Sequence, residues 1–259
     1  MCTLTVQLQR DRLLATMNRD EALTRKPETP PQIHDIPGGG QWFAPHDGEK
    51  GGTWMGASSH GVVACLLNAY LPGESLLPDT SGRYRSRGEI IPAVLEAGDV
   101  ESGIAWATNE LDRERYPSFN LLIFGSGIGK CLTWHKETDL VEYDVVSEWT
   151  LRSSSGWDSV DVKNWRENLF ANWHKSGEEM VDHLPRFHLI QEEGKEDWSP
   201  LMKRSWSATR SVTQAEVDAS TGEVVLRYWP DPHPDSKHPD VVETLPLESH
   251  LTTSRGTNG

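Results

Sequence analysis

The sequence predicts an α+β domain built in layers, and three observations lead to this class. Strand-like alternation opens the chain, helical patterns follow, and strand patterns return before and after a second helical stretch. This order contains no alternating strand–helix–strand units, which argues against a parallel, doubly wound sheet. Neither a G-x-G-x-x-G turn nor a P-loop occurs, so no nucleotide-binding fold is indicated.

Hydrophobic periodicity places the individual elements along the chain. We expect strands where apolar and polar residues alternate, over 3–9, 12–17, 53–58, 62–68, 119–124, 130–135, 140–146, 206–217 and 223–229. We expect helices over 85–97, 100–113, 162–175 and 178–184, with Asp99 as the N-cap of the second. The stretch 21–52 is rich in proline and glycine and predicts a long ordered loop.

One domain accounts for most of the 259 residues. We expect it to span 1–229, followed over 230–259 by a proline-rich segment and a partly disordered C-terminal tail. His233 and His238 lie among aspartates in this segment, but a solvated loop is favoured over a metal site. We therefore expect neither a metal nor a cofactor.

Composition limits the compartment and the class of partner. The net charge of -14 argues against nucleic acid or an anionic membrane as a partner. The N-terminus lacks the features of a signal peptide, and no apolar run reaches the length of a membrane span. The three cysteines are widely spaced and indicate neither a disulfide framework nor zinc. A cytoplasmic location is the simplest expectation.

Cys2 is the most informative single residue. A small second residue permits removal of Met1, which would leave a cysteine carrying both a thiol and a free α-amine. Because the reference pKa of such an amine is about 7.7–8.0, it can act as a general base near neutrality. The thiol beside it is a strong nucleophile once it is deprotonated. The alternative is an ordinary residue that opens a strand.

Two further segments offer polar side chains that could work with Cys2. The turn Asn18-Arg19-Asp20-Glu21 ends the second strand, which returns the chain toward residue 2. A buried Asp20 could hold an α-ammonium, and Arg19 could favour the thiolate and polarise an acyl carbonyl. Asn68 closes an apolar strand and could donate to an oxyanion. A turn held by an Arg–Asp pair and a structural amide are the plain alternatives.

Together these segments resemble a known family. MCTLTV, the NRDE turn, GGTWMG, HGVVACLLNAY, RSRGEII, PSFNLLIFG and ATRSVT occur in the order found in the NRDE family, also called the transport and Golgi organisation protein 2 family. That family is similar to N-terminal-nucleophile (Ntn) hydrolases of the choloylglycine hydrolase and penicillin acyltransferase type. The resemblance implies an αββα four-layer sandwich of two antiparallel sheets with an N-terminal cysteine nucleophile.

The resemblance also implies roles for particular residues. Cys2 matches the nucleophile, Asp20 the carboxylate that contacts the α-amine, and Asn68 an oxyanion-hole amide. These three should converge on one pocket, and Arg19 with the ammonium should lower the pKa of the thiol. The side chains expected to contact substrate are Asn18, Arg19, Trp54, Ser153, Ser154 and Arg210. The chain departs from the hydrolases at Ser153-Ser154-Ser155, where they carry a second asparagine.

Three functions follow as hypotheses. The first is a cysteine hydrolase or acyltransferase that acts on a non-peptide C–N or thioester bond of a small acyl molecule. The second is a non-catalytic carrier of haem or acyl-CoA-like lipid, since family members are linked to haem trafficking and lipid metabolism. The third is an adaptor without a ligand. For Trp54, simple packing after the Gly51-Gly52 turn is the alternative to lining a pocket.

Overall fold

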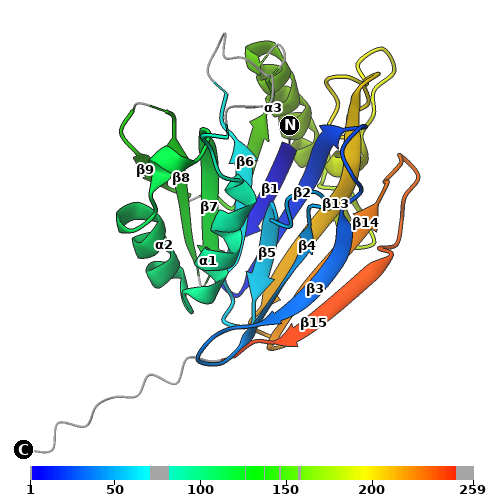
Figure 1. Ribbon diagram of the computed structural model, residues 1–259. Coiled ribbons are helices and arrows are strands. Elements are labelled where there is room, and N and C mark those ends of the chain that lie inside the picture. The colour runs from blue at the N-terminus through cyan, green and yellow to red at the C-terminus, as the bar shows by residue number, and fades with distance from the viewer. Residues whose placement is uncertain are drawn as a thin grey trace, which may run out of the picture.

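The computed structural model describes residues 2–70, 82–125, 127–136, 138–145, 147–156 and 159–248. Two large antiparallel sheets form the centre of the molecule, and helices lie on the outer faces (Figure 1). The layers are therefore α, β, β and α in that order, as the family resemblance implied.

The first sheet, called sheet A, carries the N-terminus in its interior. Its strand order is β10-β1-β2-β13-β14-β15, so segments from both ends of the chain pair side by side. The bounds are Cys2–Leu8 for β1, Arg12–Ala22 for β2, Trp149–Ser154 for β10, Ser207–Asp218 for β13, Glu223–Pro230 for β14 and Val241–Pro246 for β15. Strands β10 and β15 were not predicted. β15 belongs to the segment 230–259 and pairs with β14, so the sheet extends past residue 229.

The second sheet, called sheet B, follows sequence order from β3 to β9. Its strands are β3 Thr29–Asp35, β4 Gln41–His46, β5 Met55–Ser58, β6 Val63–Asn68, β7 Phe119–Gly125, β8 Ile128–Trp134 and β9 Val141–Asp144. The long loop predicted over 21–52 is thus wrong, because it contains β3 and β4. Pro30 and Pro31 are tolerated since β3 is an edge strand, where missing N–H donors need no partner.

Two helices cover the outer face of sheet B (Figure 1). Helix α1 spans Ile90–Glu96 after a 3₁₀ turn, η1, at Arg87–Glu89, and α2 spans Val100–Asn109. The predicted N-cap is confirmed: the Asp99 carboxylate accepts a hydrogen bond of 2.6 Å from the Ser102 N–H. An apolar layer that includes Ile91, Val94 and Leu121 fills the space between these helices and the sheet.

The outer face of sheet A carries α3, Ser159–Lys175, and the segment that follows it. The helix predicted over 178–184 is wrong, because that stretch forms the short pair β11 Met180–Val181 and β12 Leu184–Pro185. Glu178 and Asp182 have φ angles of 55° and 48°, which an α-helix does not contain. A 3₁₀ turn, η3, follows at Arg186–Leu189. A further 3₁₀ turn, η2, lies at Arg113–Arg115 before β7.

The main core lies between the two sheets. Its buried side chains come from both of them, among others Leu4 and Met17 of sheet A and Phe43, Val63 and Phe124 of sheet B. The tail predicted to be disordered from Thr252 onward lies outside the described residues. Over the part of the chain that is described, no helix has the length and apolarity required to cross a membrane.

Candidate active site around Cys2

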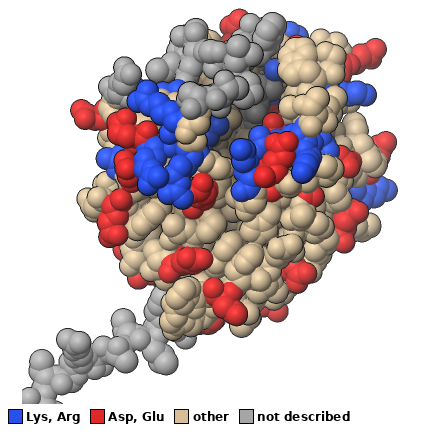
Figure 2. All heavy atoms as spheres, viewed as in Figure 1, with Lys and Arg blue, Asp and Glu red and all other residues tan. Residues whose placement is uncertain are grey.

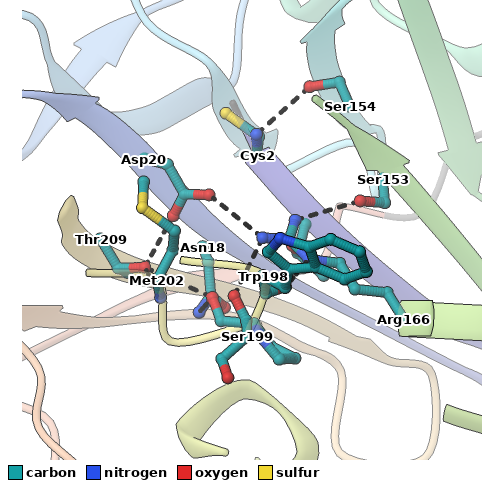
Figure 3. Close-up of polar contacts among 12 residues, drawn as sticks. Cys2, Asn18, Asp20, Ser153, Ser154, Arg166, Trp198, Ser199, Met202 and Thr209 are labelled. Atoms are coloured by element: carbon teal, nitrogen blue, oxygen red, sulfur yellow. Dashed lines mark hydrogen bonds and ion pairs between the residues drawn. The ribbon is translucent and has the colours of Figure 1, made fainter. Parts of the chain in front are cut away.

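Cys2 begins β1 in the interior of sheet A. It pairs with Ser154 of β10 on one side and with Arg19 of β2 on the other. Its backbone N–H donates to the Ser154 hydroxyl at 3.2 Å (Figure 3). The side chain is partly buried and packs against the core between the sheets. The nitrogen that would become the α-amine after removal of Met1 therefore already has a hydroxyl partner.

Burial raises the pKa of the Cys2 thiol. The charge of the chain's amino terminus is the largest effect that opposes burial, the Asp20 carboxylate adds to the rise, and the Arg19 guanidinium opposes it. With Met1 in place the pKa is therefore raised, whereas the predicted lowering by Arg19 and the ammonium of Cys2 concerns the chain without Met1 and stays a prediction. Attack by this sulfur requires a base that takes the proton during the reaction.

Arg19 is committed to carboxylates rather than to the thiol. Its guanidinium lies 2.6 Å from Asp47, 3.2 Å from Glu28 and 3.5 Å from Glu21. It also stacks on the ring of Trp54, with 4.6 Å from Cζ to the centroid. On the face shown in Figure 2, Lys and Arg side chains gather in the upper half together with acidic ones, whereas the lower half carries scattered acidic side chains. The positive charge of Arg19 is thus largely neutralised.

Asp20 faces away from the core, toward the layer that contains α3. Its Oδ1 accepts a hydrogen bond of 2.6 Å from the Thr209 hydroxyl. Its Oδ2 lies 3.9 Å from Nη2 of Arg166, and both side chains are fully buried. Burial raises the pKa of the Asp20 carboxyl, while the charges of Arg166 and the chain's amino terminus act to lower it. A buried carboxylate on which several positive groups act thus follows Arg19, the residue that pairs with Cys2.

Arg166 is the residue of this network that sequence reasoning missed. It lies within α3 and has no exposed surface. Its guanidinium donates to Thr3 Oγ1, Ser153 Oγ and the backbone oxygens of Trp198 and Ser199 (Figure 3). Its surroundings in the sequence, KNWREN, are those of any solvated helix, so no local signal marks it as buried.

Comparison with known proteins agrees with this architecture. Residues 1–221 match the family model described as Transport and Golgi organisation 2. The chain belongs to this family. A human relative, Transport and Golgi organization protein 2 homolog, is 30% identical over 115 residues, which are 43% of this chain and 38% of the human protein. The chain thus matches well under two thirds of that relative's length.

The chain is similar in fold to solved structures of hydrolases. The Caenorhabditis elegans ortholog of N-acylethanolamine-hydrolyzing acid amidase superposes with a TM-score of 0.55 over 95% of this chain and 100% of that one, at 12% identity. The C2A mutant of conjugated bile acid hydrolase from Clostridium perfringens gives a TM-score of 0.48 over 95% of this chain and 96% of its own, at 11% identity. An identity of 12% to the acid amidase concerns the fold alone, which this chain shares with that structure.

Asn68 ends strand β6 of sheet B, and Trp54 directly precedes β5 of the same sheet. Asn68 ends β6 and donates from Nδ2 to the Tyr70 hydroxyl at 2.7 Å. Burial raises the pKa of Tyr70, the bond from Asn68 lowers it, and the charges of Cys2 and Glu21 are among those that act on it. Tyr70 therefore lies near Cys2, and the role of Asn68 at an oxyanion stays a prediction. Trp54 is buried, and its indole N–H has no hydrogen-bond partner among the described residues.

The remaining predicted contact residues are spread over both faces of sheet A. Ser154 is beside the Cys2 nitrogen, whereas Ser153 bonds to Arg166 on the outer face. Asn18 is fully buried and donates to the backbone oxygens of His188 and Pro200, so it has no surface left for a ligand. Arg210 lies at a bulge of β13 and pairs with Asp231 at 3.7 Å. We do not include Asn18 or Arg210 in the site proposed below.

Proposed function

We propose that the protein is a cysteine hydrolase or acyltransferase of the Ntn type, with Cys2 as nucleophile and a small acyl amide or thioester as substrate. The observation that carries the proposal is the environment of residue 2. A buried thiol and the nitrogen that would become the base lie at the first residue of β1. The Ser154 hydroxyl is 3.2 Å from that nitrogen, and a buried Asp20 is nearby. The fold shared with Ntn hydrolases agrees with this chemistry but does not demonstrate it.

The proposed reaction proceeds through an acyl-enzyme. With Met1 removed, the α-amine of Cys2 takes the thiol proton as the sulfur attacks the acyl carbonyl. The tetrahedral oxyanion is stabilised by N–H donors, with Asn68 as the proposed side chain. The ammonium then returns its proton to the leaving amine or thiol, and a thioester remains on Cys2. Water completes hydrolysis, or an acceptor amine or alcohol completes transfer, and releases the thiol.

Asp20 and Ser154 have supporting roles in this scheme. The Asp20 carboxylate would stabilise the ammonium that forms during attack, because a negative charge nearby favours the protonated amine. The Ser154 hydroxyl would hold the amine in place, as it holds the Cys2 N–H. Neither role requires Arg19, whose charge is already balanced by Asp47 and Glu28.

Mass spectrometry of the acylated protein tests the proposal. Purified protein is incubated with acyl-CoA thioesters and N-acyl amides of increasing chain length, and the peptide that contains Cys2 is examined for a thioester. We expect an adduct on that peptide that Cys2→Ala abolishes and that hydroxylamine removes. The control is Cys65→Ala, since burial raises the pKa of Cys65 far above its usual value and should leave it inert. An adduct that survives Cys2→Ala would refute the assignment.

A non-catalytic carrier of haem or acyl-CoA-like lipid is the second candidate. It is favoured by the serines at 153 and 154, where the hydrolases carry an asparagine, and by the Asn68 amide, which donates to Tyr70. A carrier binds without turnover. Haem titration followed by absorbance, and acyl-CoA titration followed by calorimetry, would then show saturable binding in a protein that forms no adduct.

A further inference from the structure

The guanidinium of Arg166 connects helix α3 to β1, to β10 and to the segment that contains Trp198 and Ser199. It donates from Nε to Trp198 O at 2.7 Å, from Nη1 to Thr3 Oγ1 at 2.7 Å and Ser153 Oγ at 3.1 Å, and from Nη2 to Ser199 O at 2.9 Å. All of these acceptors are neutral. A buried guanidinium is costly unless an anion balances it, and among the described residues the carboxylate that lies within 4 Å of it is Asp20, at 3.9 Å.

The acceptors of Arg166 are the immediate neighbours of the Cys2 site. Thr3 follows Cys2 on β1, and Ser153 precedes Ser154 on β10, the residue whose hydroxyl contacts the Cys2 nitrogen. One guanidinium thus ties the ends of both strands together on the outer face of the sheet, directly behind the candidate nucleophile (Figure 3). β10 is an edge strand, so this tie also fixes where its end lies.

We propose that Arg166 is the positioning residue of this site: held by four neutral oxygens, it presents a fixed positive charge to Asp20 and aligns β1 with β10 around Cys2. Its function is to keep Asp20 ionised and its Oδ2 directed toward the site. Thr209 fixes the other oxygen of the carboxylate. The inference rests on the proposed function, because a positioning residue has a role in catalysis only if Cys2 reacts.

The charged groups that face Asp20 come from several elements, and Arg166 has the largest effect among them. Burial raises the pKa of Asp20, and Arg166 is the first of the groups that oppose it, followed by the amino terminus, the Thr209 hydroxyl and Arg204. Arg204 carries its own bonds to Asp197 O at 2.7 Å and 3.1 Å. Removal of Arg166 should therefore raise the pKa of Asp20 even though Arg204 remains.

The test is a carbon NMR titration of aspartate carboxyls, with the Asp20 signal assigned by Asp20→Asn. In Arg166→Met and in Arg166→Gln, which keeps two N–H donors for the buried oxygens, we expect a higher pKa of Asp20 than in the parent. The matched control is Arg227→Met, which removes another buried arginine, on β14 of sheet A, that bonds to Glu216. It should leave the pKa of Asp20 unchanged. In the unmodified protein, the side-chain nitrogen signals of Arg166 should titrate with the same pKa as Asp20, which needs no variant to fold.

Measurements of turnover distinguish a failure of this inference from a failure of the proposed function. If the parent acylates, kcat of Arg166→Gln should fall about a hundredfold with KM little changed, because misplacing a reacting group acts on the chemical step. The parent protein could show no turnover while the pKa of Asp20 still rises when Arg166 is replaced. That result would refute the proposed acyl chemistry but support the coupling between Arg166 and Asp20. The inference would be overturned if the pKa of Asp20 is unchanged in folded Arg166→Met or Arg166→Gln. It would also be overturned if the nitrogen signals of Arg166 do not shift as Asp20 titrates.

Discussion

Sheet A holds a buried carboxylate–arginine pair near each of its two ends, and the two pairs are built differently. Far from Cys2, Glu216 accepts from Arg12 Nε at 2.6 Å and from Arg227 Nη1 at 2.7 Å. Burial acts to raise the pKa of Glu216, but the bonds from Arg227 and Arg12 outweigh it and lower the pKa. Beside Cys2, Asp20 has its arginine at 3.9 Å, and burial keeps its pKa raised.

The difference separates a pair that stabilises the fold from one that is available for chemistry. Two short charge-assisted bonds fix the Glu216 carboxylate as an anion at any pH near neutrality. Asp20 accepts from the Thr209 hydroxyl, and its Oδ2 lies 3.9 Å from Arg166, so no short charge-assisted bond from that arginine fixes its charge. Buried carboxylates whose pKa is raised and that lie beside a charged partner cluster at functional sites.

The largest expected effect is on kcat, and only the substitution in the pair beside Cys2 should cause it. Asp20→Asn removes the charge that would stabilise the ammonium of Cys2, so kcat should fall about a hundredfold or more. Glu216→Gln changes the end of sheet A that is far from Cys2 and should leave kcat unchanged. Steady-state kinetics on the best substrate of the acyl panel measure both. Equal losses of kcat in Asp20→Asn and Glu216→Gln would show that the two carboxylate–arginine pairs do not differ in their role in catalysis.

Stability should show the opposite contrast. Glu216→Gln leaves two arginines without their anion, and we expect the free energy of unfolding to fall by about 2 kcal/mol. Urea denaturation of parent and variant measures the change. Arg12→Met should cost less than Arg227→Met, because the Arg12 side chain is 36% exposed and that of Arg227 only 10%. The reverse order would show that Arg227 is not the principal partner.

The pH dependence of stability should differ in sign between the two carboxylates. The pKa of Glu216 is lowered in the folded state, so its contribution is present above its unfolded pKa of about 4.3 and is lost as the pH falls. The pKa of Asp20 is raised, so its contribution is present below its unfolded pKa of about 3.9 and is lost as the pH rises. Relative to the parent, Glu216→Gln should therefore be less sensitive to acid and Asp20→Asn less sensitive to rising pH. Urea midpoints measured from pH 3 to 8 decide this.

The smallest effect is expected for an ion pair at the surface of α3. Lys163 and Glu167 lie 3.8 Å apart with side chains 60% and 52% exposed. Glu167→Ala should change the free energy of unfolding by no more than about 0.5 kcal/mol and leave kcat unaltered. This variant sets the scale against which the two buried pairs are judged. A loss of unfolding free energy as large as that of Glu216→Gln would mean that burial does not make an ion pair of this protein more important for stability.

The sequence predicted the strands around Cys2 well, because β1, β2, β13 and β14 are long and alternate regularly. It missed β3 and β4, whose prolines and intervening glycines read as a loop, and it missed the short edge strands β10 and β15. Cys2, Asp20 and Asn68 could be nominated because they stand at chain or strand ends. Arg166 could not, since a helix rich in charges gives no sign of which arginine the tertiary fold buries.

The most direct test of the account is whether acylation of Cys2 depends on a free α-amine. Two forms of the same chain are compared, one that begins at Cys2 and one that retains Met1 because its removal was inhibited during expression. Intact mass identifies each form and reports the acyl adduct after incubation with the best substrate. The account predicts a thioester on the first form and none on the second, because only the first carries the base. Equal adduct formation by both forms would contradict it.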